Sequence, residues 1–160
     1  DASDLIPTTH GIQWIICKND IPNGVSMIVG INYKNKSAEQ ILGILPGFDN
    51  SFSVGDAYCA SLLFAFNTLG LNRVTGNIYS DNERTAFLQE RFGFRREGIL
   101  KSAVWSDSLS SYKDVILIAM LRDEFMKSRV LQRFISRESR PEFLMTPRVW
   151  PRVPLSLSRG

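Results

Sequence analysis

Hydrophobic and polar residues alternate along the first third of the chain, and this alternation predicts strands. Strands are expected at 12–18 and 25–33, joined by a turn at 22–24 (Pro-Asn-Gly), and a third strand is expected at 41–45. Three consecutive strands with short connections predict an antiparallel meander.

After a loop at 46–53, the pattern alternates between helical and strand periodicity. The predicted elements are a helix at 54–69, a strand at 73–79, a helix at 83–92, a strand at 94–105, a strand at 112–121 and a helix at 123–136. This order predicts an α/β or α+β fold, in which helices cover a sheet.

The stretch 71–98 carries the clearest local signals. The strand at 73–79 is followed by Asn82, a residue that favours the N-cap of a helix, and by Glu83, whose carboxylate suits the first helical turn. Gly93 is a natural residue to end that helix. The stretch therefore predicts a strand, a polar cap, a short helix and a glycine stop.

The same stretch resembles a known family. The sequence N-x-x-T-x-x-L-x-E-R-F-G-F-x-x-E-G, from Asn82 to Gly98, is similar to the acyl-CoA-binding half of the GNAT superfamily of N-acetyltransferases. The run AF-x-x-L-G-L-N-R-V at 65–74, and Asp114 followed by VILIAML, resemble the ribosomal-protein-alanine N-acetyltransferase branch. The resemblance covers roughly residues 12–125 and implies a mixed, largely antiparallel sheet covered by helices, with acetyl-CoA as cosubstrate.

The resemblance also predicts how the chain is organised. Residues 1–125 correspond to a partial GNAT-like acyl-CoA-binding domain, and 126–160 form a basic, proline-rich C-terminal extension. GNAT domains usually open with a strand and two helices before the meander. This chain begins about where the second of those helices would end, so we expect a domain truncated at the N-terminus. Three explanations stay open: the chain is a fragment, the missing part comes from another segment or chain, or the C-terminal tail substitutes for it.

The charge is unevenly distributed. The net charge is +3, but residues 127–160 hold eight Lys/Arg and two Asp/Glu, which gives +6, and the rest hold eleven Lys/Arg and fourteen Asp/Glu, which gives −3. The basic excess therefore concerns the tail and not the domain.

Two interpretations of the tail follow. Arg148, Trp150 and Arg152 alternate charge and aromatic character, as in a nucleic-acid or ribosome contact. The favoured interpretation is a clamp that packs its apolar residues onto its own domain or onto a neighbouring subunit, as in a homodimer, because those residues are too many for a solvated arm. They are Phe143, Leu144, Val149 and Trp150.

The remaining composition fits a cytoplasmic-type protein. Cys17 and Cys59 sit in apolar patterns that predict free, buried thiols, and their spacing supports neither a disulfide nor a metal site. The longest apolar run, 115–121, is too short to span a bilayer, so no membrane contact is expected. A reducing, cytoplasmic compartment is the expected setting.

The resemblance implies where acetyl-CoA binds. The family uses R/Q-x-x-G-x-G/A at a helix N-terminus, where free backbone N–H groups attract the pyrophosphate. The matching residues here are Val54, Gly55, Asp56 and Ala57, and Phe52 stands where Arg or Gln is usual. Asp56 is interpreted as an ordinary stabilising charge at a helix N-terminus.

Asn82 and Thr85 are the next candidates. In similar proteins an Asn at this place helps hold the pantetheine arm or an ordered water, and Thr85 lies one turn on. The alternative role of Asn82 is a plain N-cap, and the two roles are compatible.

Transfer requires an amine to attack a thioester, with a base for the amine and an acid for the thiolate. Many relatives place a Tyr acid seven residues after the Asn, and here that position is Gln89. Glu39 is the candidate base, although it also fits a solvated residue of the polar segment 34–40. His10, the sole histidine, lies in a short N-terminal segment and carries little weight.

Other charged residues surround this stretch. Glu97-Gly98 fits either a pair that positions the sheet near the acceptor, as in relatives, or a β-bulge with a surface charge. Four arginines fit either the 3′-phosphate of CoA or a solvated helix face. They are Arg84, Arg91, Arg95 and Arg96.

Two hypotheses for function result. The first is an N-acetyltransferase that moves acetyl from acetyl-CoA to a primary amine, either a peptide N-terminus or a small amine, by direct transfer. The second is a catalytically degenerate module of the same fold that binds protein or nucleic acid through its basic tail. The core motif favours the first, and Phe52, Asp56 and Gln89 favour the second.

Overall fold

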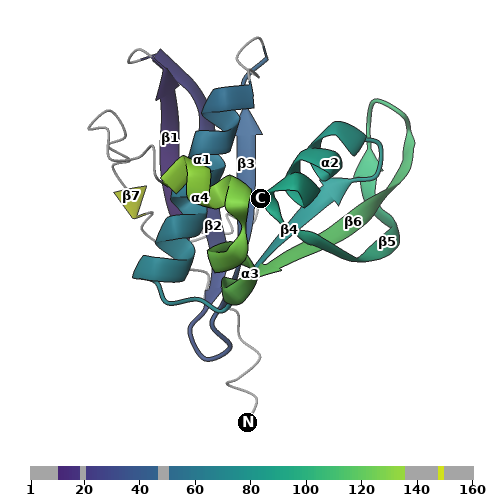
Figure 1. The fold of residues 1–160 in the computed structure, drawn as a ribbon. Coiled ribbons are helices and arrows are strands. Elements are labelled where there is room, and N and C mark those ends of the chain that lie inside the picture. Colours follow the sequence, from purple (N-terminus) through teal and green to yellow (C-terminus); the bar gives the residue numbers. More distant parts are fainter. Residues whose placement is uncertain (1–10, 19–20, 47–50, 136–147, 150–160) are drawn as a thin grey trace, which may run out of the picture.

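The computed structural model describes residues 11–18, 21–46, 51–135 and 148–149, which form a seven-stranded mixed sheet covered by helices (Figure 1). The elements are β1 (Ile12–Lys18), β2 (Ile21–Asn32), β3 (Ser37–Ile44), α1 (Ser51–Leu63), the π-helical turn η2 (Phe64–Thr68), β4 (Arg73–Tyr79), α2 (Glu83–Phe92), β5 (Arg95–Ser106), β6 (Ser111–Leu121), α3 (Arg122–Lys127), α4 (Arg129–Ile135) and β7 (Arg148–Val149). The strand order is β5-β6-β4-β3-β2-β1-β7. The predicted fold class is confirmed.

The meander is present, but its predicted turn at 22–24 is wrong, because these residues belong to β2. Gly24 pairs with Ile16 of β1 and with Ile44 of β3. A Cβ at Gly24 would lie 2.5 Å from the Gly43 carbonyl oxygen, so the glycine allows β2 and β3 to approach closely and does not form a turn. The β1–β2 connection falls at 19–20, outside the described residues.

The third strand begins at Ser37 and not at Ile41. Ala38 and Gln40 are buried on one face of β3, and Glu39 between them is partly exposed. Burial therefore alternates with a period of two from Ser37 to Leu42. The polar character of Gln40 concealed it, because a buried glutamine does not count as a hydrophobic position.

The predicted helix at 54–69 is divided in two. α1 begins at Ser51 and ends at Leu63, and the chain continues as the π-helical turn η2, in which the Leu69 N–H donates to the Phe64 carbonyl at 3.0 Å. The elements from β4 to β6 agree with their predicted bounds to within one residue.

The predicted helix at 123–136 is also two helices, which meet at Ser128. The Ser128 hydroxyl donates to the Phe92 carbonyl at 2.9 Å and accepts the N–H of Leu131 at 3.4 Å. Ser128 therefore ends α3, caps α4 and ties both to the end of α2.

The core lies between the sheet and its helices. Ile28, Leu62, Phe66 and Phe125 are fully or almost fully buried, and Phe66 and Phe125 rings lie 4.9 Å apart. α1 contacts β2 and β3 and lies in front of them in Figure 1, with α4 beside it.

The two cysteines differ from each other. Cys59 is buried in α1 and its thiol donates to the Leu131 carbonyl at 3.7 Å, as a buried free thiol is expected to do. The expectation for Cys17 is wrong: its thiol is free but exposed, because Trp14 and Ile16 take the buried face of β1 and Cys17 falls on the other.

Two residues of the tail lie on the sheet. Arg148 and Val149 form β7, which pairs antiparallel with Gln13 and Ile12 of β1. Main-chain pairing onto the domain's own edge strand is the arrangement expected of a clamp. The other apolar residues of the predicted clamp lie outside the described residues.

The feature that creates the site is the parallel pair in the centre of the sheet. β3 and β4 pair only through 37–39 and 73–75, and beyond these residues neither strand pairs with the other. Residues 40–44 keep their pairing with β2, and 76–79 keep theirs with β6. The two strands therefore part, and the facing edges of their main chains line an open wedge.

Candidate functional site

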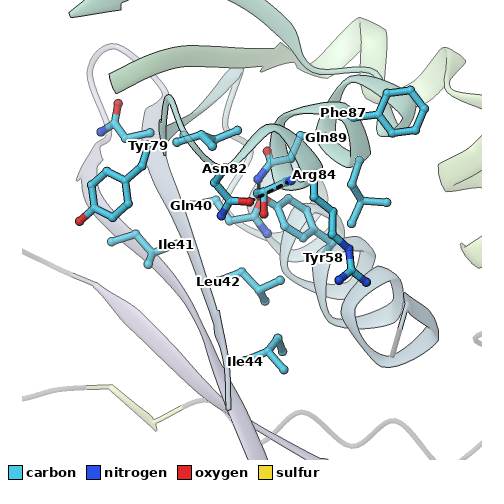
Figure 2. Close-up of a pocket in the computed structure, with 15 residues that line it drawn as sticks. Gln40, Ile41, Leu42, Ile44, Tyr58, Tyr79, Asn82, Arg84, Phe87 and Gln89 are labelled. Carbon is cyan, nitrogen blue, oxygen red and sulfur yellow. Dashed lines mark hydrogen bonds between the residues drawn. The ribbon is translucent and has the colours of Figure 1, made fainter. Parts of the chain in front are cut away.

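A cavity of about 640 Å³ occupies this wedge, between β3, β4, α1 and α2 (Figure 2). Ile41, Leu42 and Ile44 of β3 and Phe87 and Leu88 of α2 give it apolar walls. This volume lies in the range of small-molecule sites, roughly 300 to 1,000 Å³. Its polar residues come from all four elements.

Asn82 stands at the N-terminus of α2 and lines the cavity. Its Oδ1 accepts the N–H of Thr85 at 3.2 Å, so the predicted N-cap is confirmed. Thr85 also lines the cavity. The cap places both side chains at the wall where a ligand would lie, but their role in binding one stays a prediction.

The end of α2 follows the expected glycine stop. Gly93 has φ 110°, a left-handed conformation, and its N–H donates to the carbonyls of Gln89 and Glu90 at 3.2 and 3.0 Å. α2 is thereby fixed at both ends beside the wedge.

Gln89 and Tyr58 form a buried pair at the cavity. Gln89 is 5% exposed and Tyr58 3%, and the Gln89 Nε2 donates to the Tyr58 Oη. The Tyr58 ring stacks on Phe92 at 5.7 Å and meets Phe94 edge-on at 6.1 Å. Burial raises the pKa of Tyr58 well above its usual value, and the hydrogen bond from Gln89 offsets this only in part, so the hydroxyl keeps its proton.

Sequence reasoning missed Tyr58. It lies in an apolar helical stretch, where an aromatic residue is most simply a core residue. Only its contact with Gln89, distant in sequence, identifies it.

A second buried polar group comes from β3. The Gln40 Nε2 donates to the Ser61 hydroxyl, which itself lies within 2.9 Å of the Ala57 carbonyl. Ser61 and Tyr58 are three residues apart on α1 and therefore neighbours on one helix face. Among the described residues, the Oε1 atoms of Gln40 and Gln89 have no hydrogen-bond partner. Buried carbonyl oxygens are normally satisfied, so a ligand or water is expected to meet these two.

Glu39 lies where the two strands part. It is the last β3 residue paired with β4, opposite Thr75, and its carboxylate accepts from the Asn77 Nδ2 at 2.8 Å. It belongs to a strand and not to a solvated connection, and it points to the face of β3 opposite Gln40. Asn77 lines the cavity, so the predicted base adjoins it.

The N-terminus of α1 is displaced from its expected position. α1 begins at Ser51, and the backbone N–H groups without intrahelical acceptors belong to the first turn, 51–54. Of the four residues predicted to bind pyrophosphate, only Val54 lies in that turn, and Gly55, Asp56 and Ala57 follow it. Pyrophosphate binding at these residues stays a prediction.

Two of the four arginines that fit either the 3′-phosphate or a solvated face form ion pairs with carboxylates. Arg95 pairs with Glu124 at 2.7 Å, and Arg96 pairs with Glu90. Arg84 is the arginine that lines the cavity.

Two further carboxylates, Glu97 and Asp114, form contacts that involve β5. Glu97 sits at a β-bulge, as one interpretation of Glu97-Gly98 expected, and the Arg73 guanidinium lowers its pKa. Asp114 accepts from the Lys101 ammonium at 2.8 Å and from the Ser102 N–H at 2.9 Å. Both carboxylates contact residues of the sheet, so we interpret their role as stabilising the fold.

The described part of the chain contains no group of three or more His, Cys, Asp or Glu side chains placed to hold a metal ion. His10 lies outside that part. None of the helices in the described ranges is long and apolar enough to cross a membrane.

Comparison with known proteins finds acetyltransferases among the similar proteins. No protein-family model matches the chain. It is similar to YoaA of Bacillus subtilis (strain 168), described as an uncharacterized N-acetyltransferase, with 24% identity over 121 residues, which cover 74% of this chain and 68% of that protein.

Two solved structures with a similar fold are also described as acetyltransferases. A protein assigned to the acetyltransferases without a stated acceptor matches with a TM-score of 0.71 and 22% identity, over 79% of this chain and 66% of that one. A spermidine N-acetyltransferase from Vibrio cholerae, described as dodecameric, matches with a TM-score of 0.69 and 21% identity, over 74% and 69%. The chain thus spans about two thirds of the length of these proteins. The structure has the fold of the GNAT N-acetyltransferases, as the resemblance implied.

Proposed function

We propose that this chain transfers an acetyl group from acetyl-CoA to a primary amine. The observation that carries the proposal is the wedge between β3 and β4, where two parallel neighbours part beside the capped start of α2. An extended ligand with amide groups fits such an opening, because the unpaired N–H and C=O groups of a strand edge are hydrogen-bond partners for it.

The chain path supports one direction for the bound acetyl-CoA. β3 runs from the closed end of the wedge at Glu39 to its open end at Ile44, and α1 begins a few residues later. The first turn of α1 therefore belongs to the open end, where a helix N-terminus favours the pyrophosphate. The pantetheine arm would lie along β3, with Asn82 and Thr85 opposite, and the thioester would reach the closed end.

The chemistry requires one base and one site for the departing sulfur. The amine nitrogen attacks the carbonyl carbon, the C–S bond breaks with its electron pair on sulfur, and the proton lost by nitrogen is finally carried by the thiol of CoA. Glu39, held by Asn77, is the proposed base, acting directly in a complex of both substrates. The backbone edge at the closed end would stabilise the oxyanion.

The acceptor is proposed by class only. The resemblance to the ribosomal-protein-alanine branch favours a peptide N-terminus, and the spermidine acetyltransferase of similar fold suggests a polyamine as the second choice. Both are primary amines, and an acceptor screen that contains both classes separates them.

The alternative function is a module of this fold that binds a partner without catalysis. The observation that favours it is Gln89, which takes the place of the expected acid and is engaged with Tyr58.

Calorimetric titration with acetyl-CoA, followed by an assay of free thiol with peptide and polyamine acceptors, tests the two functions. The proposal expects binding, thiol release that depends on an amine, and loss of turnover with retained binding in Glu39→Gln. Binding without turnover on any amine would favour the alternative. Absence of binding in a folded sample would overturn acyl-CoA chemistry altogether.

A further inference from the structure

The Tyr58–Gln89 pair offers hydrogen-bond donors to the cavity, one helical turn from Ser61, which binds Gln40 beside the last paired residue of β3. Together the two side chains carry three polar hydrogens, two on Nε2 and one on Oη, and their mutual hydrogen bond uses one of them. Both side chains line the cavity, and both are almost completely buried. Figure 2 shows Tyr58 and Gln89 reaching the cavity from α1 and α2 respectively.

The pair also presents an acceptor. The Gln89 Oε1 is buried and has no partner among the described residues. Within the described part of the chain, this buried pair offers a donor and an acceptor besides its mutual hydrogen bond, which fits a ligand with the opposite arrangement. The reactive end of an acyl-CoA has that arrangement: sulfur and carbonyl oxygen accept, and the amide N–H two carbons from the sulfur donates.

We infer that Tyr58 is a catalytic residue of the proposed reaction, which donates a hydrogen bond to the sulfur of the acyl thioester while Gln89 holds its hydroxyl in place. This inference rests on the proposed function. The chain thereby supplies from α1 the donor that relatives place on α2, seven residues after the asparagine. The glutamine on α2 becomes the residue that orients it.

The chemistry is a hydrogen bond and not a full proton transfer. Tyr58 keeps its proton because burial disfavours the phenolate. As the C–S bond breaks, the electron pair moves to sulfur and the Tyr58 O–H stabilises the negative charge. The proton lost by the amine ends on the sulfur, so no further reactant is required.

The sulfur contact is testable without a known acceptor. The affinities of CoA and of desulfo-CoA, which lacks the sulfur, are measured by calorimetry on the full chain and on Tyr58→Phe. The phenylalanine keeps the ring between Phe92 and Phe94 and removes only the hydroxyl. Tyr79→Phe is the matched control, because Tyr79 also lines the cavity but is 51% exposed.

The native chain is expected to prefer CoA over desulfo-CoA by roughly two- to ten-fold, the value of one hydrogen bond. In Tyr58→Phe this preference should fall to about one, and in Tyr79→Phe it should persist. If the native chain binds both equally, or folded Tyr58→Phe keeps the preference, the inference is overturned while the proposed function stands. If the native chain binds neither, the proposed function fails and the inference fails with it.

If Tyr58→Phe is unfolded by circular dichroism, Gln89→Glu provides the second measurement. A carboxylate at residue 89 accepts hydrogen bonds and does not donate them. The hydrogen of the Tyr58 hydroxyl should therefore point toward residue 89 and away from the cavity. The preference for CoA should then be lost in a folded protein. A retained preference would contradict the role of Tyr58.

Discussion

Two substitutions of Asn82 distinguish its effect on the stability of α2 from its effect on the affinity for acetyl-CoA. The Asn82 Oδ1 accepts one hydrogen bond, from the Thr85 N–H at 3.2 Å, and both residues line the cavity. Asn82→Ala removes the cap and the amide together. Loss of an N-cap costs about 1 kcal/mol, which corresponds to roughly 2–4 °C in Tm for a chain of this size.

Asn82→Ser is the matched control. Serine caps a helix about as well as asparagine, so the stability of this variant should stay near that of the native chain. It lacks the Nδ2 donor, however. If the amide holds the pantetheine arm, both variants should bind acetyl-CoA roughly two- to ten-fold more weakly, and only Asn82→Ala should also melt earlier.

Thermal melts without ligand and calorimetric titration with acetyl-CoA give both quantities on the same samples. Native affinity in folded Asn82→Ser would refute the ligand role and leave Asn82 as a cap. Equal melting of Asn82→Ala and the native chain would refute the capping argument, since the hydrogen bond to Thr85 would then contribute nothing measurable.

Three further predictions concern the fold. Gly24→Ala should lower the free energy of unfolding by about 1–3 kcal/mol in urea denaturation, since the new Cβ meets the Gly43 carbonyl; an unchanged midpoint would contradict the close approach. Lys101, and then the Ser102 N–H, hold the pKa of Asp114 below its usual 3.8, so Asp114 stabilises the fold above that pH and loses this effect as pH falls further; Asp114→Asn should be less stable at pH 7, and the difference should shrink below about pH 4. Deletion of 140–160 should lower Tm because it removes β7; an unchanged Tm with loss of salt-sensitive RNA binding would instead favour a nucleic-acid arm.

Local sequence signals predicted the ends of a helix correctly where residues next to those ends determine them. Asn82 caps α2 and Gly93 ends it as predicted, because both effects depend on the backbone of neighbouring residues. The turn at Gly24 was wrong for the opposite reason. A Pro-Asn-Gly run favours a turn locally, but here the glycine serves contacts with two other strands, which only the tertiary structure specifies.

The sequence predicted site residues only at positions that belong to the motif carrying the family resemblance. Asn82, Thr85 and Gln89 were found by resemblance, and all three line the cavity. Tyr58 and Gln40 were not found, because each looks like part of a core pattern until a partner from another element appears. Buried polar residues that are far apart in sequence leave no periodic signal.

The Tyr58–Gln89 pair gives a final test of whether these polar residues serve the fold or the ligand. Replacing both buried partners by apolar residues of similar shape removes the unpaired Gln89 Oε1 along with their hydrogen bond, and such exchanges are nearly neutral or stabilising. The double variant Tyr58→Phe/Gln89→Leu should therefore unfold in urea within about 1 kcal/mol of the native chain, or later. It should nevertheless lose the preference for CoA over desulfo-CoA. If the double variant is less stable by about 3 kcal/mol or more, the pair serves to stabilise the core. The burial of these polar groups would then be explained by stability, and it would no longer support a donor role for Tyr58.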